Sequence, residues 1–285
     1  MSAKPVTIVR TIAGLRAQVA AWRTAGDRVA LIPTMGALHA GHLSLVALGR
    51  ERAERTVASI FVNPTQFAPH EDFEAYPREE AKDAERLSEA GCDLLFAPSV
   101  EEMYAPGFST TVTVAGVSGP MDGAARPHHF AGVATVVAKL LIQCGPDVAI
   151  FGQKDYQQLQ VIRRLAMDLD LPVEIVGGPT VRAPDGLALS SRNAYLSAAE
   201  RVVAGKLNLI LKTAIDALRD GEAVDKVEAA GLKALAEAGF DPIDYLEVRD
   251  PNDLSRLGPG PLDVPGRILV AARIGRTRLI DNMAV

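Results

Sequence analysis

The sequence predicts an α/β fold, because short apolar runs alternate with longer charged segments that have helical spacing. The runs are rich in β-branched residues, and this alternation is typical of a Rossmann-like parallel sheet whose strands are joined by crossover helices. Strands are expected at Val29–Pro33, Val57–Val62, Asp93–Ala97 and Val148–Phe151, and helices at Leu43–Arg55, Pro77–Ala90, Ala131–Gln143 and Tyr156–Leu169.

A tract rich in glycine and proline, GGPTVRAPDG at Gly177–Gly186, indicates a domain boundary. After it, two helical segments at Ala198–Asp220 and Ala223–Ala238 precede the strand-like stretches YLEV and RILVAARIGRTRLIDN. We therefore expect a Rossmann-like domain at 1–180 and a smaller C-terminal α+β domain at 181–285. No internal repeat or low-complexity segment is evident, which excludes solenoids.

Composition excludes several classes of protein. The net charge is -5 and the pI about 5.6, which argues against a nucleic-acid partner. No stretch of about 18 apolar residues is present, and Arg10 and Arg16 interrupt the N-terminal apolar residues, so neither a membrane span nor a signal peptide is expected. Cys92 and Cys144 form no metal-binding or disulfide pattern and are expected to be buried, reduced thiols of a cytoplasmic protein.

The stretch PTMGALHAGH, Pro33–His42, is the first candidate for chemistry. A strand ending near Thr34, a turn at Gly36 and a helix starting near His39 give the geometry in which backbone N–H groups receive a phosphate. His39 and His42 would share one helix face, and Gly41 between them would let a ligand approach the backbone.

Other interpretations of this stretch are open. The two histidines are also typical of half-buried or helix-capping residues, and HxGH supplies only two of the ligands that a zinc site requires. The usual phosphate-binding fingerprints GxGxxG and GxxxxGK[ST] are absent. The interpretation therefore depends on residues elsewhere in the chain.

Polar side chains follow two other predicted strands. SIFVNPTQF places Asn63 and Gln66 in a loop at the carboxyl edge of the sheet, where open α/β sheets bind ligands. FGQKDYQQL places Lys154, Asp155 and Gln158 on the first turn of the next expected helix. Lysine binds phosphate, and a carboxylate accepts hydrogen bonds from ribose hydroxyls. Polar turns without function are the alternative for both segments.

Two further segments carry groups that suit anions. GLALSSRN supplies the hydroxyls of Ser190 and Ser191 and the guanidinium of Arg192, which matches pyrophosphate; a simple helix cap is the alternative. ARPHHFAGVATVV places Arg126 and His129 ahead of a helix, where they could close over an anionic substrate. Together with HxGH, SSRN indicates nucleotidyl transfer.

With these residues assembled, the chain resembles the pantothenate synthetase (pantoate:β-alanine ligase) family, which is related to the HxGH nucleotidyltransferases. The motifs PTMGALHxGH, FVNPTQF, RPxHF, GQKDYQQL, LALSSRN and LVAARIGRTRLIDN occur in family order over nearly the full length. The resemblance implies that ATP and (R)-pantoate form pantoyl-adenylate and pyrophosphate, and that β-alanine then displaces AMP to give pantothenate.

The resemblance also implies site residues. ATP would contact Met35, Gly36, His39, Gly41, His42, Gly152, Lys154, Asp155, Val181, Leu189, Ser190, Ser191 and Arg192. Gln66 and Gln158 would hold pantoate, and to these we add Asn63, Arg126 and His129 as substrate contacts. His42 would be the proton donor, in a catalytic set with His39, Lys154, Ser190, Ser191 and Arg192.

The family further implies a homodimer, and Mg²⁺ that is held by the ATP phosphates without an assigned protein ligand. Residues 181–285 are expected to act as a lid, with Gly177, Gly178 and Gly186 as hinges. Departures from the family pattern at Ala40, Gln153 and His128 fall where the chemistry requires no particular side chain.

Two alternatives remain at this stage. An HxGH nucleotidyltransferase would act on a phosphorylated substrate, and the neutral Gln66 and Gln158 disfavour this alternative. A non-catalytic nucleotide-binding homologue would be expected to lack charged residues such as Lys154 and Arg192.

Overall fold

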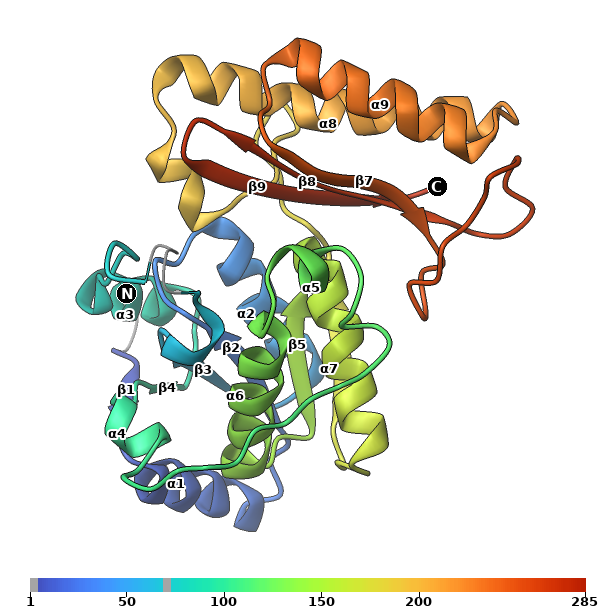
Figure 1. The fold of residues 1–285 in the computed structure, drawn as a ribbon. Helices are drawn as coiled ribbons and strands as arrows, with labels where there is room; N and C mark the ends of the chain where they lie inside the picture. The colour runs from blue at the N-terminus through green and yellow to red at the C-terminus, as the bar shows by residue number, and fades with distance from the viewer. Residues whose placement is uncertain (1–4, 69–72) are drawn as a thin grey trace. The chain divides into compact units, whose positions relative to one another are not determined.

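The computed structural model describes residues 5–68 and 73–285 and is drawn in Figure 1. Its contacts divide the chain into two compact units. The first consists of Met1–Ala115, Arg126–Gln153 and Val161–Pro179, and the second of Gly116–Ala125, Lys154–Gln160 and Thr180–Val285. Each unit is described by itself.

The first unit is built on a parallel sheet, as the alternating apolar runs predict. Within the described residues its strands are β1 (Thr7–Val9), β2 (Val29–Thr34), β3 (Arg55–Ile60), β4 (Leu94–Phe96), β5 (Val148–Gly152) and β6 (Glu174–Gly178), in the order β1-β4-β3-β2-β5-β6. Every neighbouring pair is parallel. The chain runs outward from β2 to β3 and β4 and then crosses to β5 on the other side of β2. The strand order therefore reverses beside β2, which is where open α/β sheets bind ligands.

Helices cover this sheet (Figure 1). They are α1 (Ile12–Thr24), α2 (Ala40–Arg52), α3 (Glu80–Glu89), α4 (Val100–Met103), α6 (His129–Cys144) and α7 (Tyr156–Asp168), whose first turn belongs to the second unit, with short 3-10 helices η1 (Pro64–Gln66) and η2 (Gln153–Asp155). The helix predicted at Leu43–Arg55 lies three residues earlier in the structure, at Ala40–Arg52. It starts earlier because His39 caps it, and it ends earlier because Ala53 has an extended backbone, which lets Arg55 begin β3.

The sequence reasoning missed β1, α1 and β6. β1 and β6 are short strands at the two edges of the sheet and are partly exposed, so their apolar pattern is weak. The tract predicted as a domain boundary, Gly177–Gly186, starts within a strand, since Gly177 and Gly178 lie in β6 and pair with β5. A Cβ at Gly178 would lie 2.2 Å from Leu45 Cδ2, so this glycine allows α2 to pack on the sheet.

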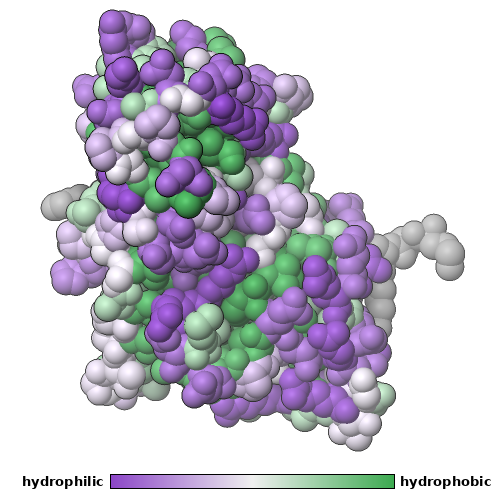
Figure 2. Space-filling model, turned by 90° about the vertical axis from the view of Figure 1, so that its right-hand side faces the viewer, coloured by the Kyte–Doolittle hydropathy of each residue, from purple (hydrophilic) through white to green (hydrophobic). Residues whose placement is uncertain are grey.

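Both cysteines are buried free thiols, as predicted. Burial raises the pKa of the Cys144 thiol to about 12, and it also raises that of Cys92. Neither thiol is therefore a nucleophile near neutral pH. Among the described residues, no helix has the length and apolar character needed to cross a bilayer. On the face drawn in Figure 2, hydrophilic and apolar residues are mixed.

The second unit contains a three-stranded antiparallel sheet, in the part of the chain that is described. Its strands are β7 (Ile243–Arg249), β8 (Arg267–Ile274) and β9 (Thr277–Ala284), in the order β7-β8-β9. The long helices α8 (Ala198–Arg219) and α9 (Val224–Ala238) lie side by side over this sheet (Figure 1) and share its apolar core. This is the α+β architecture expected for the C-terminal part.

Two earlier segments join this unit through buried polar contacts. Asp122 in the short helix α5 (Asp122–Ala125) accepts hydrogen bonds at Oδ1 from Arg278 Nη2 at 2.5 Å and from Tyr245 Oη at 3.0 Å. Arg278 Nε donates to Asp244 at 2.7 Å. Gln157 Oε1 accepts from the Asp122 backbone N–H at 3.0 Å, which ties the start of α7 to the same network. These contacts explain why both segments belong to the second unit.

The network changes the ionisation of its members. Burial, followed by the Asp122 carboxylate, raises the pKa of Tyr245 well above its usual value. Burial lowers the pKa of Arg278, but the carboxylates of Asp122 and Asp244 outweigh it, so the net shift is upward. The phenol is thus protonated, and the guanidinium charged, throughout the physiological range.

We predict that Tyr245→Phe alters the alkaline arm of the stability curve. Because the folded pKa of Tyr245 is raised, its contribution is complete below the unfolded pKa of about 10 and is lost as pH rises toward the folded pKa, by about 1.4 kcal/mol per pH unit. Near neutral pH, the free energy of unfolding of the wild type should exceed that of the variant by about 1 kcal/mol. Urea unfolding of both proteins between about pH 8 and 11 should show this difference shrinking above about pH 10. A difference that is constant with pH would contradict the assignment.

Candidate functional site

The loop between β2 and α2, Met35–Leu38, is held by one buried carboxylate. Asp83 on α3 accepts hydrogen bonds from the backbone N–H groups of Ala37 and Leu38, both at 2.8 Å. Gly36 and Ala37 have φ values of 83° and 50°, so the chain turns through the left-handed region here. Burial raises the pKa of Asp83, although the two backbone N–H groups oppose the shift. The loop therefore has a defined conformation at the carboxyl end of β2.

The two histidines of HxGH cap α2. His39 Nδ1 accepts from the Gly41 N–H at 3.1 Å, and His42 Nδ1 accepts from the His39 N–H at 3.3 Å. The ring centroids are 4.1 Å apart. Because each Nδ1 acts as an acceptor, each neutral ring carries its proton on Nε2. The capping interpretation of these histidines is thus correct, and it is compatible with Nε2 acting as a donor to a ligand.

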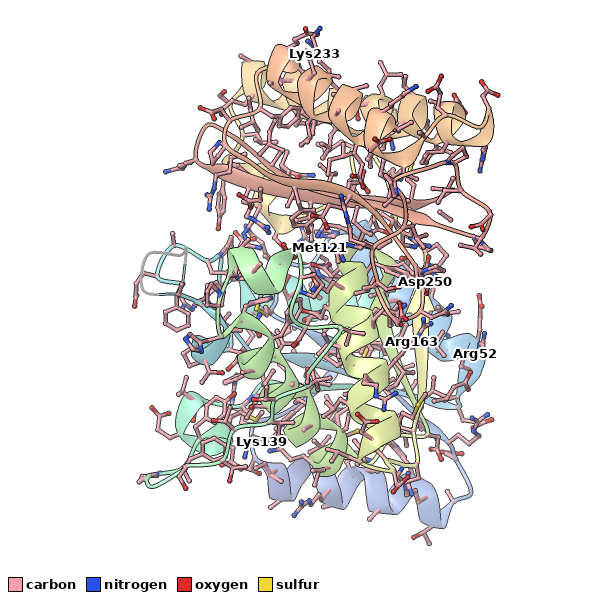
Figure 3. All side chains as sticks on the ribbon, turned by 45° about the vertical axis from the view of Figure 1, so that its right-hand side comes forward. Arg52, Met121, Lys139, Arg163, Lys233 and Asp250 are labelled. Carbon is pink, nitrogen blue, oxygen red and sulfur yellow. The ribbon has the colours of Figure 1, made fainter. Side chains whose placement is uncertain are left out.

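Amide side chains lie beside this loop. Gln66 in η1 donates from Nε2 to Met35 Sδ at 3.1 Å, and its Oε1 accepts from Asn63 Nδ2 at 3.1 Å. Asn63 is buried and its Oδ1 accepts from Tyr104 Oη at 2.7 Å. Lys139 lies on α6 and is labelled in Figure 3, and its Nζ is 5.8 Å from the centroid of the Tyr104 ring. Gln66 is therefore oriented by contacts on both ends of its amide.

Arg126 and His129 support the same segment. Arg126 Nη1 lies 3.1 Å from His129 Nε2, and His129 Nδ1 lies 2.9 Å from the Gln66 backbone oxygen. Since a guanidinium can only donate, His129 accepts at Nε2 and donates from Nδ1. Gly132 lets α6 approach closely, because a Cβ there would lie 2.4 Å from the Thr65 backbone oxygen. In the first unit, the structure thus connects Met35, Asn63, Gln66, Arg126 and His129.

Lys154 and Asp155 follow β5, but they lie in η2 and not on the first turn of α7 as the sequence suggested. Gln158 lies in α7 and is half-buried. Lys154 Nζ is 3.4 Å from Asp155 Oδ2, and its backbone oxygen accepts from Asn282 Nδ2 at 2.8 Å. Gly152, the last residue of β5, is in the first unit.

Val181 and Leu189 lie opposite each other in a tight turn of the second unit. The Leu189 N–H donates to the Val181 oxygen at 2.9 Å. Between them, Arg182 forms a bidentate pair with the buried Asp281 at 2.6 and 2.8 Å. Gly186 turns the chain with φ of 91°. The turn is therefore anchored to β9 immediately before the SSRN segment.

The SSRN segment forms the 3-10 helix η3 (Ser191–Tyr195). Ser190 caps it, since its Oγ accepts from the Arg192 N–H at 3.3 Å, and so the predicted alternative of a helix cap is realised. Asn193 Nδ2 donates to the Ala188 oxygen at 3.0 Å and fixes the segment to the turn that precedes it. The second unit thus holds Lys154, Asp155, Gln158 and the segment Val181–Arg192.

A family model described as pantoate-beta-alanine ligase matches residues 7–284 of the chain. The chain belongs to this family. It is 64% identical over 279 residues to the pantothenate synthetase of Caulobacter vibrioides, covering 98% of each chain. A crystal structure of pantothenate synthetase from Thermus thermophilus matches with a TM-score of 0.91 and 47% identity, covering 98% of this chain and 99% of the other. The α/β fold of this family is therefore confirmed.

A third relative is a crystal structure of the pantoate–β-alanine ligase from Francisella tularensis, complexed with β,γ-ATP and β-alanine. It has a TM-score of 0.82 and 31% identity, covering 98% of this chain and 97% of the other. As a pantoate–β-alanine ligase, the chain is an enzyme that forms pantothenate. Membership of this family excludes both alternative functions, which were a nucleotidyltransferase acting on a phosphorylated substrate and a non-catalytic homologue.

Several residues that shape the ligase were missed by sequence reasoning. Asp83 lies within a charged helix. The one feature of the sequence that could have indicated its burial is its spacing of four residues from Leu87, which places both on the buried face of α3. Asp281 and Asn282 stood within the closing motif LVAARIGRTRLIDN without an assigned role. In the structure they hold Arg182 and Lys154 through the hydrogen bonds given above.

We predict that Asp83→Asn lowers kcat for pantothenate formation by about 10- to 100-fold, because an amide cannot accept from both backbone N–H groups and the loop would move. Glu85→Gln, an exposed residue on the same helix, is the matched control and should leave kcat unchanged. Steady-state kinetics with circular dichroism as a check on folding measures the effect. A folded Asp83→Asn enzyme with wild-type kcat would show that the loop does not depend on this carboxylate.

Proposed function

We propose that this ligase works through an adenylate. The pantoate carboxylate attacks the α-phosphorus of ATP and pyrophosphate leaves; the β-alanine nitrogen then attacks the acyl carbon, AMP leaves, and the amine loses a proton. The observation that carries this proposal is the pair of histidine rings, 4.1 Å apart, at the N-terminus of α2 beside the reversal of strand order. The relative from Francisella tularensis, complexed with β,γ-ATP and β-alanine, supports it.

The first step brings two anions together. Holding a carboxylate in line with the α-phosphorus can lower the barrier by about 7–11 kcal/mol, because the entropy cost of encounter is met on binding. Negative charge then grows on the phosphoryl oxygens and on pyrophosphate. We assign His39, His42, Lys154 and Arg192 as donors to this charge, each typically worth about 3–4 kcal/mol.

The other assigned residues bind the substrates. Pantoate would be held by Gln66 and Gln158. Further substrate contacts would come from Asn63, Arg126 and His129. The hydrogen bonds to both ends of the Gln66 amide support this role, since they orient the group before substrate arrives. ATP would further contact Met35, Gly36, Gly41, Gly152, Asp155, Val181, Leu189, Ser190 and Ser191. We assign no residue as general base for the second step, because a mixed anhydride with AMP as leaving group is already reactive.

We propose that Mg²⁺ enters with ATP and is held by its phosphates. Within residues 5–68 and 73–285, no group of three His, Cys, Asp or Glu side chains is placed to hold a metal ion. The donors assigned to the phosphates are imidazoles, a lysine and an arginine, which suit phosphate oxygens, whereas Mg²⁺ prefers oxygen ligands. When bound, Mg²⁺ would neutralise part of the phosphate charge.

We predict that His42→Ala lowers kcat by about 10²–10³-fold with little change in the KM for pantoate, since His42 would act on charge that develops in the transition state. The matched control is His128→Asn. His128 is exposed with φ of 73°, a conformation that asparagine tolerates, and this variant should keep wild-type kcat. A His42→Ala enzyme of near-normal rate would remove His42 from the mechanism.

The reaction sequence is tested by product release. Pyrophosphate and AMP are measured from MgATP with pantoate alone, and then with β-alanine added. The proposal requires a bound pantoyl-adenylate when β-alanine is omitted, and sustained AMP release only when both substrates are present. Sustained AMP release without pantoate would contradict it.

We propose that residues 181–285 act as a lid that keeps water from the adenylate. The left-handed Gly186 supports a hinge, whereas Gly177 and Gly178 lie in β6 and are no longer proposed as hinges. Limited proteolysis should cleave the segment 179–189 more slowly when MgATP and pantoate are present. Equal cleavage rates would contradict the lid.

We propose that the enzyme is a homodimer. Residues 109–115, STTVTVA, alternate as a strand does, yet they lie in no strand of the described chain and most are exposed. Pairing of the exposed residues with the same segment of a second copy would add backbone hydrogen bonds between the two chains. Sedimentation should give twice the chain mass of 30.2 kDa, and Thr113→Pro should give monomers. A wild-type monomer would refute the dimer.

We also propose a cytoplasmic location, supported by the two buried free thiols and by the need for ATP. Cell fractionation tests this: pantothenate-forming activity in another fraction would contradict it.

A further inference from the structure

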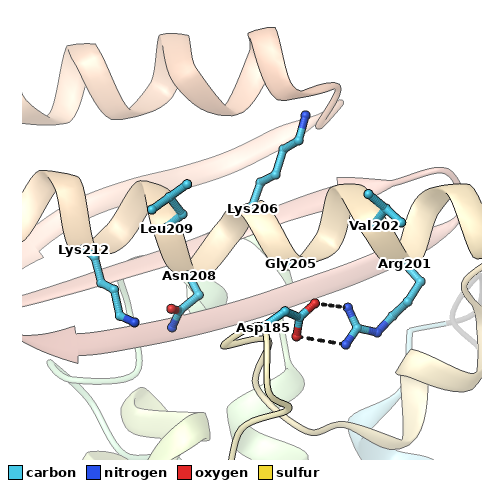
Figure 4. A pocket seen from close by; sticks show the side chains of 8 residues that line it. All are labelled: Asp185, Arg201, Val202, Gly205, Lys206, Asn208, Leu209 and Lys212. Carbon is cyan, nitrogen blue, oxygen red and sulfur yellow. Dashed lines mark hydrogen bonds and ion pairs between the residues drawn. The ribbon is translucent and has the colours of Figure 1, made fainter.

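A hollow with a volume of about 500 Å³ lies along α8 in the second unit (Figure 4). None of its residues belongs to the proposed ATP or substrate contacts. They are Asp185, Arg201, Val202, Gly205, Lys206, Asn208, Leu209 and Lys212. The hollow is therefore a candidate site separate from the proposed reaction.

One side of the hollow is a polar row on α8. Arg201, Gly205, Asn208 and Lys212 are spaced by four, three and four residues and so share one helix face. Asp185 lies over this row and pairs with Arg201 at 2.5 and 3.0 Å, as the dashed lines in Figure 4 show. A Cβ at Gly205 would lie 2.5 Å from Asp185 Oδ2, so the glycine makes room for the pair.

Asn208 provides a donor without an acceptor. Its side chain is 2% exposed, and its Nδ2 has no hydrogen-bond partner among the described residues. Gly186 lies against the other end of the amide, since a Cβ there would be 2.3 Å from Asn208 Oδ1. A buried amide N–H without a partner is unfavourable, and a ligand oxygen at this point would relieve that cost.

The hollow also has an excess of positive charge. Asp185 neutralises Arg201, whereas Lys206 and Lys212 are exposed and form no ion pair in the described part of the chain. Beside the polar row, Val202 and Leu209 are 70% and 65% exposed and lie seven residues apart, so they form an apolar strip on α8. The surface therefore offers a cation, an amide donor and an apolar strip side by side.

We propose that this hollow binds a small aliphatic carboxylate. One carboxylate oxygen accepts from Asn208 Nδ2, the charge faces Lys212 Nζ, and the aliphatic chain lies against Val202 and Leu209. Phosphate fits less well, because Arg201 is already paired with Asp185 through Nη1 and Nη2, and few donors are left for a third oxygen. Occupancy would also affect the turn that carries Asp185 and Gly186.

The test is a titration of the ¹⁵N-labelled full-length chain with pentanoate, followed by NMR. The Asn208 side-chain amide signal, identified by its absence in Asn208→Ser, should shift with a Kd on the order of 1 mM. Lys212→Gln should weaken binding by about 3- to 5-fold, which is the range for an exposed charge. Lys226→Gln, an exposed lysine on α9 outside the hollow, is the matched control and should not change it.

Pentan-1-ol, which has the same chain without the charge, and inorganic phosphate should each bind at least about tenfold more weakly than pentanoate. An unshifted Asn208 amide, equal Kd values for wild type and Lys212→Gln, or phosphate binding as tight as that of pentanoate would each overturn the proposal. The NMR readout requires no turnover, so its result is independent of the proposed reaction.

Discussion

The geometry of the loop that leads into the HxGH motif depends on a single buried carboxylate. Asp83 is fully buried, and burial raises its pKa, yet it accepts hydrogen bonds from two successive backbone N–H groups of the loop after β2. These bonds hold a left-handed turn, and that turn decides where α2 begins. Because His39 is the first residue outside that helix, the positions of both histidine rings follow from a residue on α3.

In the second unit, charged side chains join segments that lie far apart in the sequence. Asp122, Arg278 and Asp244 hold an early segment to the sheet, and the Arg182 pair with Asp281 holds the turn before the SSRN segment. Paired charges of this kind contribute little to net stability compared with apolar packing, but removing one partner is strongly unfavourable. Their effect is therefore to specify which segments come together.

Much of the first unit could be predicted from sequence because its central strands, such as β2 and β5, are buried on both faces and appear as continuous apolar runs. β1 and β6 could not, because edge strands are partly exposed and short. The HxGH and SSRN segments were found from residue types that suit phosphate. Asp83 could not be found in the same way, since its role depends on a loop that lies 45 residues away in the chain.

The sequence also could not predict that the segments 116–125 and 154–160 belong to the second unit. Asp122 and Gln157 lie far from Tyr245 and Arg278 in sequence, and no local pattern marks them as partners. The placement of site residues within each unit thus follows from tertiary contacts, while their chemical identity follows from the motifs.

The discontinuous make-up of the second unit bears on how the protein is made. Strand β9, the last element of the chain, supplies Arg278, Asp281 and Asn282, which pair with Asp122, Arg182 and the Lys154 backbone. As a ribosome releases the chain from the N-terminus onward, Asp122 emerges more than 150 residues before Arg278. The second unit therefore cannot complete its polar contacts until Arg278 has been synthesised, whereas every strand of the parallel sheet precedes that residue in the chain.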